Sequence, residues 1–153
     1  MDEQAESGGV LVRNAQERVV LRDGLVGELA ERAALVLELI RRGSLACGAI
    51  PGEVGIILID DRRISRIHRD YFGNAGPTDV ITFPYGDYGE VLISVETARR
   101  QGGEYATSTE DELALYMVHG ILHLCGHEDG SREGRARMEE LQERLLGEGR
   151  GGG

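Results

Sequence analysis

Aromatic residues are scarce in this sequence: tryptophan is absent, and aromatic side chains make up only 5% of the 153 residues. Aliphatic side chains must therefore fill the interior, for which an apolar fraction of 41% is sufficient. The two cysteines, Cys47 and Cys125, are too few for the disulfide framework of a small secreted protein. No apolar run approaches the roughly 18 residues of a membrane-spanning helix.

The amino terminus lacks a basic start followed by an apolar stretch, so the sequence predicts no signal peptide. Together with cysteines that we interpret as reduced thiols, this predicts a cytoplasmic protein with no membrane partner. The length fits a single domain. We expect disorder over residues 1–9 and a flexible glycine-rich tail over residues 148–153, which leaves a folded domain over residues 10–147.

Positive charge is also in short supply, because 17 basic residues face 27 acidic ones and the net charge is −10. Taken alone, this balance argues against a nucleic-acid partner, since phosphate binding depends on cations. Four arginines nevertheless recur through one short segment: Arg62, Arg63, Arg66 and Arg69. We interpret them first as the solvated face of a helix, and a local basic strip is the alternative.

Strand patterns are found at residues 10–12, 54–59, 80–83 and 90–93, the third ended by Pro84. Helical spacing predicts helices from an Asp23 cap to Gly43, over residues 64–71, from Ser94 to Gln101, from Ser108 or Thr109 to Leu124, and over residues 131–147. The order of these elements predicts an α+β fold, in which a small mixed β-sheet is packed with helices. The helix ending at Leu124 has a capping-box pattern, Thr109-x-x-Glu112, and is apolar nearly all round, so we expect it at the centre of the domain.

This central helix carries the residues with a chemical signature. His119 and His123 are four residues apart, so a helix points both imidazoles in the same direction, as in zinc enzymes with a helical His-x-x-x-His pair. Such a pair also arises by chance, but burying two imidazoles without partners would cost about 1–3 kcal/mol each. Gly126 then allows the helix to stop and the chain to return a third ligand, from His127, Glu128 or Asp129. A fourth position is left for water.

Three blocks of sequence extend the pattern beyond the histidines. Residues 119–126 read His-Gly-Ile-Leu-His-Leu-Cys-Gly, residues 76–84 read Gly-Pro-Thr-Asp-Val-Ile-Thr-Phe-Pro, and residues 89–94 read Gly-Glu-Val-Leu-Ile-Ser. In their order along the chain, first 76–84, then 89–94 and last 119–126, the blocks resemble the signatures of the YbeY family of endoribonucleases. The resemblance spans about residues 50–145.

The resemblance implies an α+β fold around a central helix, one zinc ion (Zn²⁺), and cleavage of single-stranded RNA. It further implies a role in maturing the 3′ end of small-subunit ribosomal RNA and in ribosome quality control. The expected partners are therefore single-stranded RNA, ribosomal RNA and the small ribosomal subunit. The oligomeric state is left open.

Two departures from the family pattern affect the expected site. The family's third histidine falls on Asp129, whose carboxylate binds zinc at a distance similar to that of an imidazole nitrogen, so we assign the metal to His119, His123 and Asp129, with His127 as the alternative third ligand. Phe72 stands where the family usually has a functional arginine. Arg66 or Arg69 is a candidate replacement for that cation.

Other residues near the motifs receive more modest interpretations. With a zinc-bound water as the expected nucleophile, Glu128 is the nearest acid in sequence and a candidate general base. We interpret His68 as a core histidine and Cys125 as a buried thiol that points away from the metal ligands. Thr78 and Asp79 are expected to line the cleft, with a purely structural role in the turn as the alternative.

Three other functions compete with an endoribonuclease. A zinc peptidase needs His-Glu-x-x-His, but Gly120 occupies the position of the glutamate. A non-haem iron oxygenase also uses two histidines and one carboxylate. The main alternative is a ribosome-associated RNA-binding factor that holds a structural zinc and has little catalytic activity.

Overall fold

The computed structural model describes residues 3–72 and 79–148, and within these ranges the chain alternates between strands and helices. In chain order the elements are β1 (Glu3–Ser7), β2 (Val10–Asn14), α1 (Leu25–Arg42), β3 (Glu53–Ile59), α2 (Asp61–Phe72), β4 (Val80–Tyr85), β5 (Tyr88–Ser94), α3 (Val95–Glu104), α4 (Thr109–Leu124) and α5 (Arg132–Glu148).

The described strands form one mixed sheet in the order β1-β2-β3-β5-β4. The central strands β2, β3 and β5 are parallel, whereas β1 and β4 are antiparallel strands at the two edges. β3 is rich in isoleucine and is almost wholly buried, as expected for a parallel strand covered on both faces. The predicted α+β fold with a small mixed sheet is confirmed.

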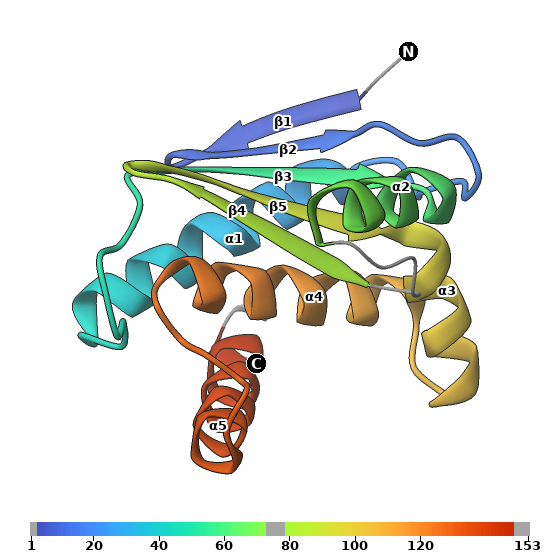
Figure 1. Cartoon of the computed structure of the whole chain (residues 1–153). Helices are drawn as coiled ribbons and strands as arrows, with labels where there is room; N and C mark the ends of the chain where they lie inside the picture. Colours follow the sequence, from blue (N-terminus) through green and yellow to red (C-terminus); the bar gives the residue numbers. More distant parts are fainter. Residues whose placement is uncertain (1–2, 73–78, 149–153) are drawn as a thin grey trace.

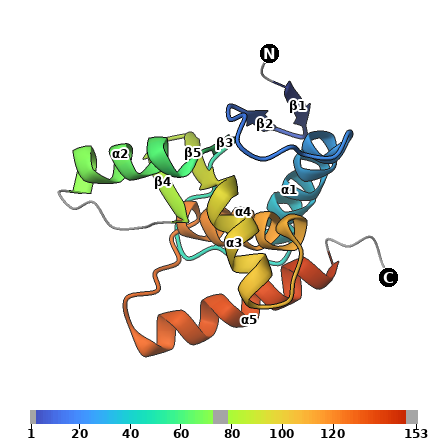
Figure 2. The same cartoon turned by 90° about the vertical axis from the view of Figure 1, so that its right-hand side faces the viewer.

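Helices cover both faces of this sheet, but unequally. α1 and α4 pack against one face, and α5 lies against the far side of α4 (Figure 1). The short helix α2 covers part of the opposite face, where Ile64 packs with Ile59, Ile81 and Leu92 in a small second core. In the turned view α2 and α1 lie on opposite sides of the molecule (Figure 2). The predicted central position of α4 is therefore confirmed.

α4 approaches the sheet unusually closely, because two glycines remove side chains from the contact. A Cβ atom added to Gly120 of α4 would collide with Cγ1 of Val91 in β5. A Cβ atom on Gly89 of β5 would lie 2.7 Å from Cδ1 of Leu124, the last residue of α4. Separations this short are not found in folded proteins, so glycine at both positions fixes the distance between α4 and β5.

The amino terminus and the end of β4 differ from the structure that the sequence predicts. Residues 3–7 were expected to be disordered, but they pair with β2 as the edge strand β1, and their exposed polar side chains suit an edge. The strand expected to stop at Pro84 continues to Tyr85. Pro84 is tolerated because β4 is an edge strand, which pairs with β5 alone. Residues 149–153, most of the expected tail, lie outside the described residues.

Two helix caps also differ from the expectation. α1 has Gly24 at its N-cap with a φ of 86°, and no side chain caps it, so Asp23 does not have the role predicted for it. At the start of α4 the cap is Ser108 rather than Thr109, and its hydroxyl accepts a hydrogen bond from the backbone N–H of Asp111. Ser94 caps α3 as predicted.

Asp61 anchors the first turn of α2 to the rest of the domain. Its carboxylate accepts hydrogen bonds from Ser94 Oγ, Thr97 Oγ1 and the Arg100 guanidinium. Burial on its own raises the pKa of Asp61, but these hydrogen bonds and the Arg100 charge outweigh it and hold the pKa below its ordinary value. The charged carboxylate therefore ties α2 to β5 and α3.

None of the helices in the described part of the chain combines the length and the apolar character that a membrane span requires.

Replacing Gly120 with alanine tests the close contact between α4 and β5. Overpacking costs about 1–3 kcal/mol, which exceeds the gain of about 1 kcal/mol from replacing glycine inside a helix. We expect Gly120→Ala to lower the free energy of unfolding measured with urea. Gly27→Ala in α1 is the matched control, because no heavy atom lies within 4 Å of its added Cβ.

A double-mutant cycle with Val91→Ala tests whether contact with Val91 causes the loss of stability in Gly120→Ala. In the Val91→Ala background the colliding methyl groups are gone, so Gly120→Ala should cost much less than in the wild type. An equal cost in both backgrounds would show that Val91 is not the source of the strain.

Candidate metal centre

Three side chains converge at the carboxyl-terminal end of α4. His119 and His123 lie on one face of the helix, and their Nε2 atoms are 3.1 Å apart. Asp129, from the segment that follows the helix, brings Oδ2 to 3.5 Å from Nε2 of His119 and 3.6 Å from Nε2 of His123. Within the described residues, this is the one group of His, Cys, Asp or Glu side chains with the spacing of a metal site.

The end of α4 directs Asp129 back towards the two histidines. Gly126 has a φ of 96°, its N–H donates to the carbonyl of His123, and the N–H of His127 donates to the carbonyl of Leu122. These two bonds form a Schellman motif, which reverses the chain after a helix. Because Gly126 lies only three residues before Asp129, this reversal leaves the carboxylate beside the side chains of the last two turns of α4.

The three ligand atoms fit a tetrahedral metal ion. A tetrahedron with bonds of about 2.0–2.1 Å, the length of zinc bonds to nitrogen and oxygen, has edges of about 3.3–3.4 Å. The three observed separations, 3.1, 3.5 and 3.6 Å, lie close to that value. Two imidazole nitrogens and one carboxylate oxygen are also a donor set that zinc accepts. The residues present therefore fit a zinc ion.

A residue of α5 orients His119. The side-chain oxygen Oε1 of Gln142 lies 2.6 Å from Nδ1 of His119. Because an amide oxygen only accepts, Nδ1 must carry the proton, which leaves the lone pair on Nε2 facing His123 and Asp129. Gln142 has no signal in the sequence, because nothing in the chain order indicates that α5 docks beside His119.

His127, the alternative third ligand, lies elsewhere. It is buried, its Nε2 atom is 2.6 Å from the carbonyl oxygen of Leu45, and its Nδ1 atom is 3.4 Å from Sγ of Cys47. The backbone N–H groups of Cys47 and Gly48 also donate to the carbonyl of Cys125. His127 thus holds the segment after α1 against the end of α4, and both of its ring nitrogens are engaged there.

A cleft of about 300 Å³ opens beside the two histidines. Its walls come from α4, from the edge strand β4 and from the end of α2, and the lining residues are His68, Phe72, Asp79, Val80, Ile81, Thr82, His119 and His123. The structure thus places Asp79 in the cleft, where the sequence analysis expected it, whereas Thr78 lies outside the described residues. The interpretation of His68 as a core histidine is wrong: it is half-buried and lines the cleft.

The other candidates take no part in the metal group. Glu128 is exposed and is not among the described residues that line the cleft, so its role as a base stays a prediction. Cys125 is fully buried as expected, and burial raises the pKa of its thiol to about 11. This thiol is therefore protonated at neutral pH.

A comparison with protein families decides the identity of the chain. A family model described as endoribonuclease YbeY matches residues 14–149. The chain belongs to the YbeY family. The match covers α1 to α5 and includes all three residues of the candidate metal centre. The predicted family is confirmed.

Individual YbeY relatives match over most of the chain. The endoribonuclease YbeY of Pelotomaculum thermopropionicum is 35% identical over 150 residues, which cover 90% of this chain and 95% of the relative. That of Moorella thermoacetica is 37% identical over 136 residues, with 77% and 87% coverage. The Myxococcus xanthus protein of the same name is 42% identical over 106 residues, but the match covers only 36% of that longer protein.

The fold of this YbeY chain also resembles a solved structure. The solution structure of TM1509 from Thermotoga maritima aligns with a TM-score of 0.57 and 26% sequence identity, covering 91% of each chain. This likeness supports the sheet order and helix arrangement described above.

Ligand substitutions test the metal centre of this YbeY protein. His123→Ala should abolish zinc binding. Loss of a residue that hydrogen-bonds to a metal ligand weakens zinc binding by about 10- to 100-fold, and Asp129→Ala should weaken it by more than this because it removes a ligand itself. His127→Ala should leave zinc affinity unchanged but lower the free energy of unfolding by about 1–3 kcal/mol, because it removes a buried hydrogen bond. Titration with a chromophoric zinc chelator measures the affinities. Zinc loss in His127→Ala with retention in Asp129→Ala would reverse the assignment.

Gln142→Leu tests the orientation of His119. Without an acceptor at Nδ1, the ring is free to adopt the other tautomer, and zinc affinity should fall by about 10- to 100-fold. Gln142→Glu retains an acceptor and should bind zinc at least as tightly as the wild type. The same chelator competition measures both variants, and equal affinities for Gln142→Leu and the wild type would contradict the role of Gln142.

Proposed function

We propose that this protein is a zinc-dependent endoribonuclease that cleaves single-stranded RNA in the cytoplasm. Its proposed place is the maturation of the 3′ end of small-subunit ribosomal RNA and ribosome quality control, with the small ribosomal subunit as partner. The observation that carries the proposal is a three-ligand group beside an open cleft. Membership of the YbeY family supports the choice of RNA as substrate.

The exposure of the ligands supports a catalytic rather than a structural metal. The side chains of His119, His123 and Asp129 are 29%, 22% and 45% exposed, so the fourth side of the group faces solvent and the cleft. Structural zinc sites are closed by four protein ligands, whereas catalytic sites keep three and an open position. This contrast disfavours the alternative, an RNA-binding factor with a structural zinc.

A zinc ion held by His119, His123 and Asp129 would act as a Lewis acid and would lower the pKa of water at the open position to about 7. Side chains of the protein orient the metal ligands and bind the RNA. Gln142 holds His119 in the tautomer that presents Nε2. Thr82 and His68 offer polar groups to the phosphate or ribose of an RNA strand lying in the cleft. The apolar side chains of Phe72 and Ile81 reduce the exposure of that strand to water.

Proton transfer needs an acid or base within reach of the reacting phosphate. Asp79 lines the cleft with both metal-binding histidines, whereas Glu128 is exposed outside it. We therefore assign the general base to Asp79 ahead of Glu128, the residue favoured by the sequence. The position of Gly120, in close contact with Val91, also explains why the glutamate of zinc peptidases has no place in this helix.

RNA cleavage by the purified protein tests this proposal. We expect a labelled single-stranded RNA to be cut and a duplex of the same sequence to stay intact, because only unpaired strands enter the cleft. A chelator should stop cleavage and added zinc should restore it, whereas restoration only by ferrous iron would favour the oxygenase-type site. RNA that is bound but left intact by fully zinc-loaded protein would establish the binding-factor alternative.

Matched carboxylate variants separate the two candidate bases. Asp79→Asn should lower kcat by about 100-fold or more, within the range of general base catalysis, while zinc affinity stays unchanged. Glu128→Gln is the control and should cleave at the wild-type rate. The opposite result would return the role to Glu128.

A further inference from the structure

A continuous row of aromatic rings runs from the end of α2 along the β4–β5 hairpin. Successive ring centroids in this aromatic row are 5.2 to 6.5 Å apart, through the pairs His68–Phe72, Phe72–Phe83, Tyr71–Phe83, Phe83–Tyr85 and Tyr85–Tyr88. The chain has only seven phenylalanines and tyrosines, and five of them lie in this row. A protein so poor in aromatic residues has gathered most of them in one place.

The aromatic row is largely exposed to solvent. Tyr71, Phe72 and Tyr85 are 69%, 53% and 59% exposed, so these rings contribute little to the core. Phe83, half-buried between them, joins the row to the small core under α2. A contiguous exposed apolar patch of this kind marks a binding surface more often than a packing defect.

The row opens directly into the candidate metal cleft. His68 and Phe72 form its first members and also line the cleft that holds His119 and His123. From there the alternation along β4 brings Phe83 and Tyr85 to the same face of the sheet as α2. A ligand that extends out of the cleft over the end of α2 therefore meets these rings next.

The charges around the row favour an anionic ligand at the end nearest the cleft. Arg66 and Arg69 are exposed in the last two turns of α2, the end nearest the cleft, and Arg66 forms no ion pair with any described residue. Arg69 lies 3.9 Å from Asp70, a long and exposed pair. The protein contains no lysine and has a net charge of −10, but α2 carries four arginines against only Asp61 and Asp70. Arginine binds phosphate with two parallel hydrogen bonds and also stacks on bases.

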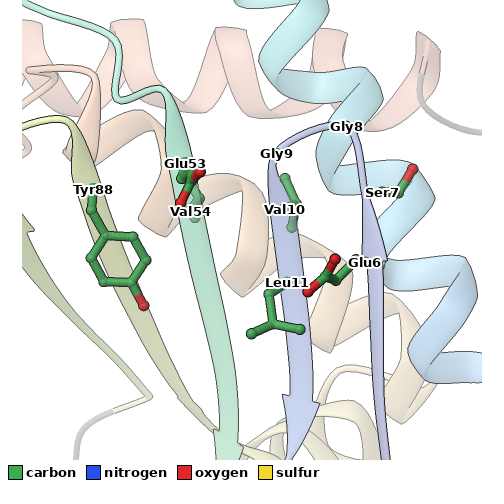
Figure 3. Close-up of a pocket in the computed structure, with 9 residues that line it drawn as sticks. All are labelled: Glu6, Ser7, Gly8, Gly9, Val10, Leu11, Glu53, Val54 and Tyr88. Carbon is green, nitrogen blue, oxygen red and sulfur yellow. The ribbon is translucent and has the colours of Figure 1, made fainter.

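Carboxylates mark the other end of the row. Tyr88 donates a hydrogen bond to Glu90, and burial together with this carboxylate raises the pKa of Tyr88 to about 12. Beyond Tyr88 lies a hollow of about 440 Å³ whose lining includes Glu6 and Glu53 (Figure 3). A polyanion is repelled from this side, so the usable part of the row runs from Phe72 to Tyr85.

We propose that the aromatic row is a stacking track that holds the bases of a single-stranded RNA outside the metal cleft, with the arginines of α2 beside its phosphates. The identity of the ligand rests on the proposed function. Every base has a flat face to stack on a ring, so the track accepts any sequence. Duplex RNA has its bases stacked internally and presents none to the rings, so the track selects unpaired strands.

Binding of a labelled oligouridylate of about ten nucleotides, followed by fluorescence anisotropy, tests the track. Tyr85→Ala should weaken binding by about 5- to 150-fold, since base stacking contributes about 1–3 kcal/mol per base. Tyr85→Phe keeps the ring and should bind within about twofold of the wild type. Tyr105→Ala is the matched control, because Tyr105 is 69% exposed but lies outside the row, and it should have no effect.

The length of the RNA provides a second readout that a merely structural role would not affect. A dinucleotide, the shortest RNA with a phosphodiester to cut, extends least beyond the cleft, so Tyr85→Ala should cleave it like the wild type. For longer RNA the KM of Tyr85→Ala should rise while kcat stays unchanged. Photocrosslinking of 5-iodouridine RNA should give adducts at Tyr71, Phe72 or Tyr85.

Each alternative outcome has a defined meaning. Unchanged binding by Tyr85→Ala, an equal loss in Tyr105→Ala, or crosslinks elsewhere would overturn the track and leave the nuclease proposal standing. Binding that depends on Tyr85 without any cleavage would support the track and refute the nuclease. A shift from dimer to monomer in Tyr85→Ala with unchanged RNA affinity would assign the row to a second copy of the chain instead.

Discussion

The contact between α4 and β5 is the constraint on which the rest of the structure depends. Gly120 lies between the two histidines of the candidate metal centre, and its missing side chain lets the helix rest on Val91. The face of α4 that meets the sheet is thereby fixed, and His119 and His123 must project from another side, towards the edge strand β4. A side chain at Gly120 would separate helix and sheet and carry both histidines away from the wall of the cleft. Packing and chemistry are therefore coupled at one residue.

Local sequence signals were sufficient for the parts of the site that lie close together in the chain. The spacing of His119 and His123 and the glycine at position 126 correctly indicated a paired set of imidazoles followed by a reversal. Gln142 and His68 could not be found in this way, because they reach the site only after α5 docks on α4 and α2 packs on the far face of the sheet. Such positions are determined by tertiary packing, and a single sequence considered alone contains no local signal for them.

The errors in the fold have a similar origin. The pairing of β1 with β2 depends on backbone hydrogen bonds across the turn at Gly8 and Gly9, so polar side chains that suggest disorder are compatible with an edge strand. Pro84 would end a central strand, but whether a strand is central or at an edge is a property of the sheet order. The start of α1 was misassigned because Gly24 replaces a side-chain cap by a left-handed backbone conformation.

α2 connects the core, the cleft and the aromatic row. Ile64 holds its inner face against the sheet, while the arginines occupy its outer face and Phe72 ends it beside His119 and His123. The solvated-face interpretation of those arginines and a binding role are therefore compatible, because an amphipathic helix must expose its polar side whatever that side contacts. α2 differs from the other helices because its exposed arginines lie near the rings of the aromatic row. Where the resemblance to the family predicts an arginine, this chain has Phe72, a ring that joins a row of rings. The net charge of this acidic protein disfavours contacts with phosphate. Stacking of bases on these rings would replace the missing cation at position 72 and retain an RNA strand through base contacts.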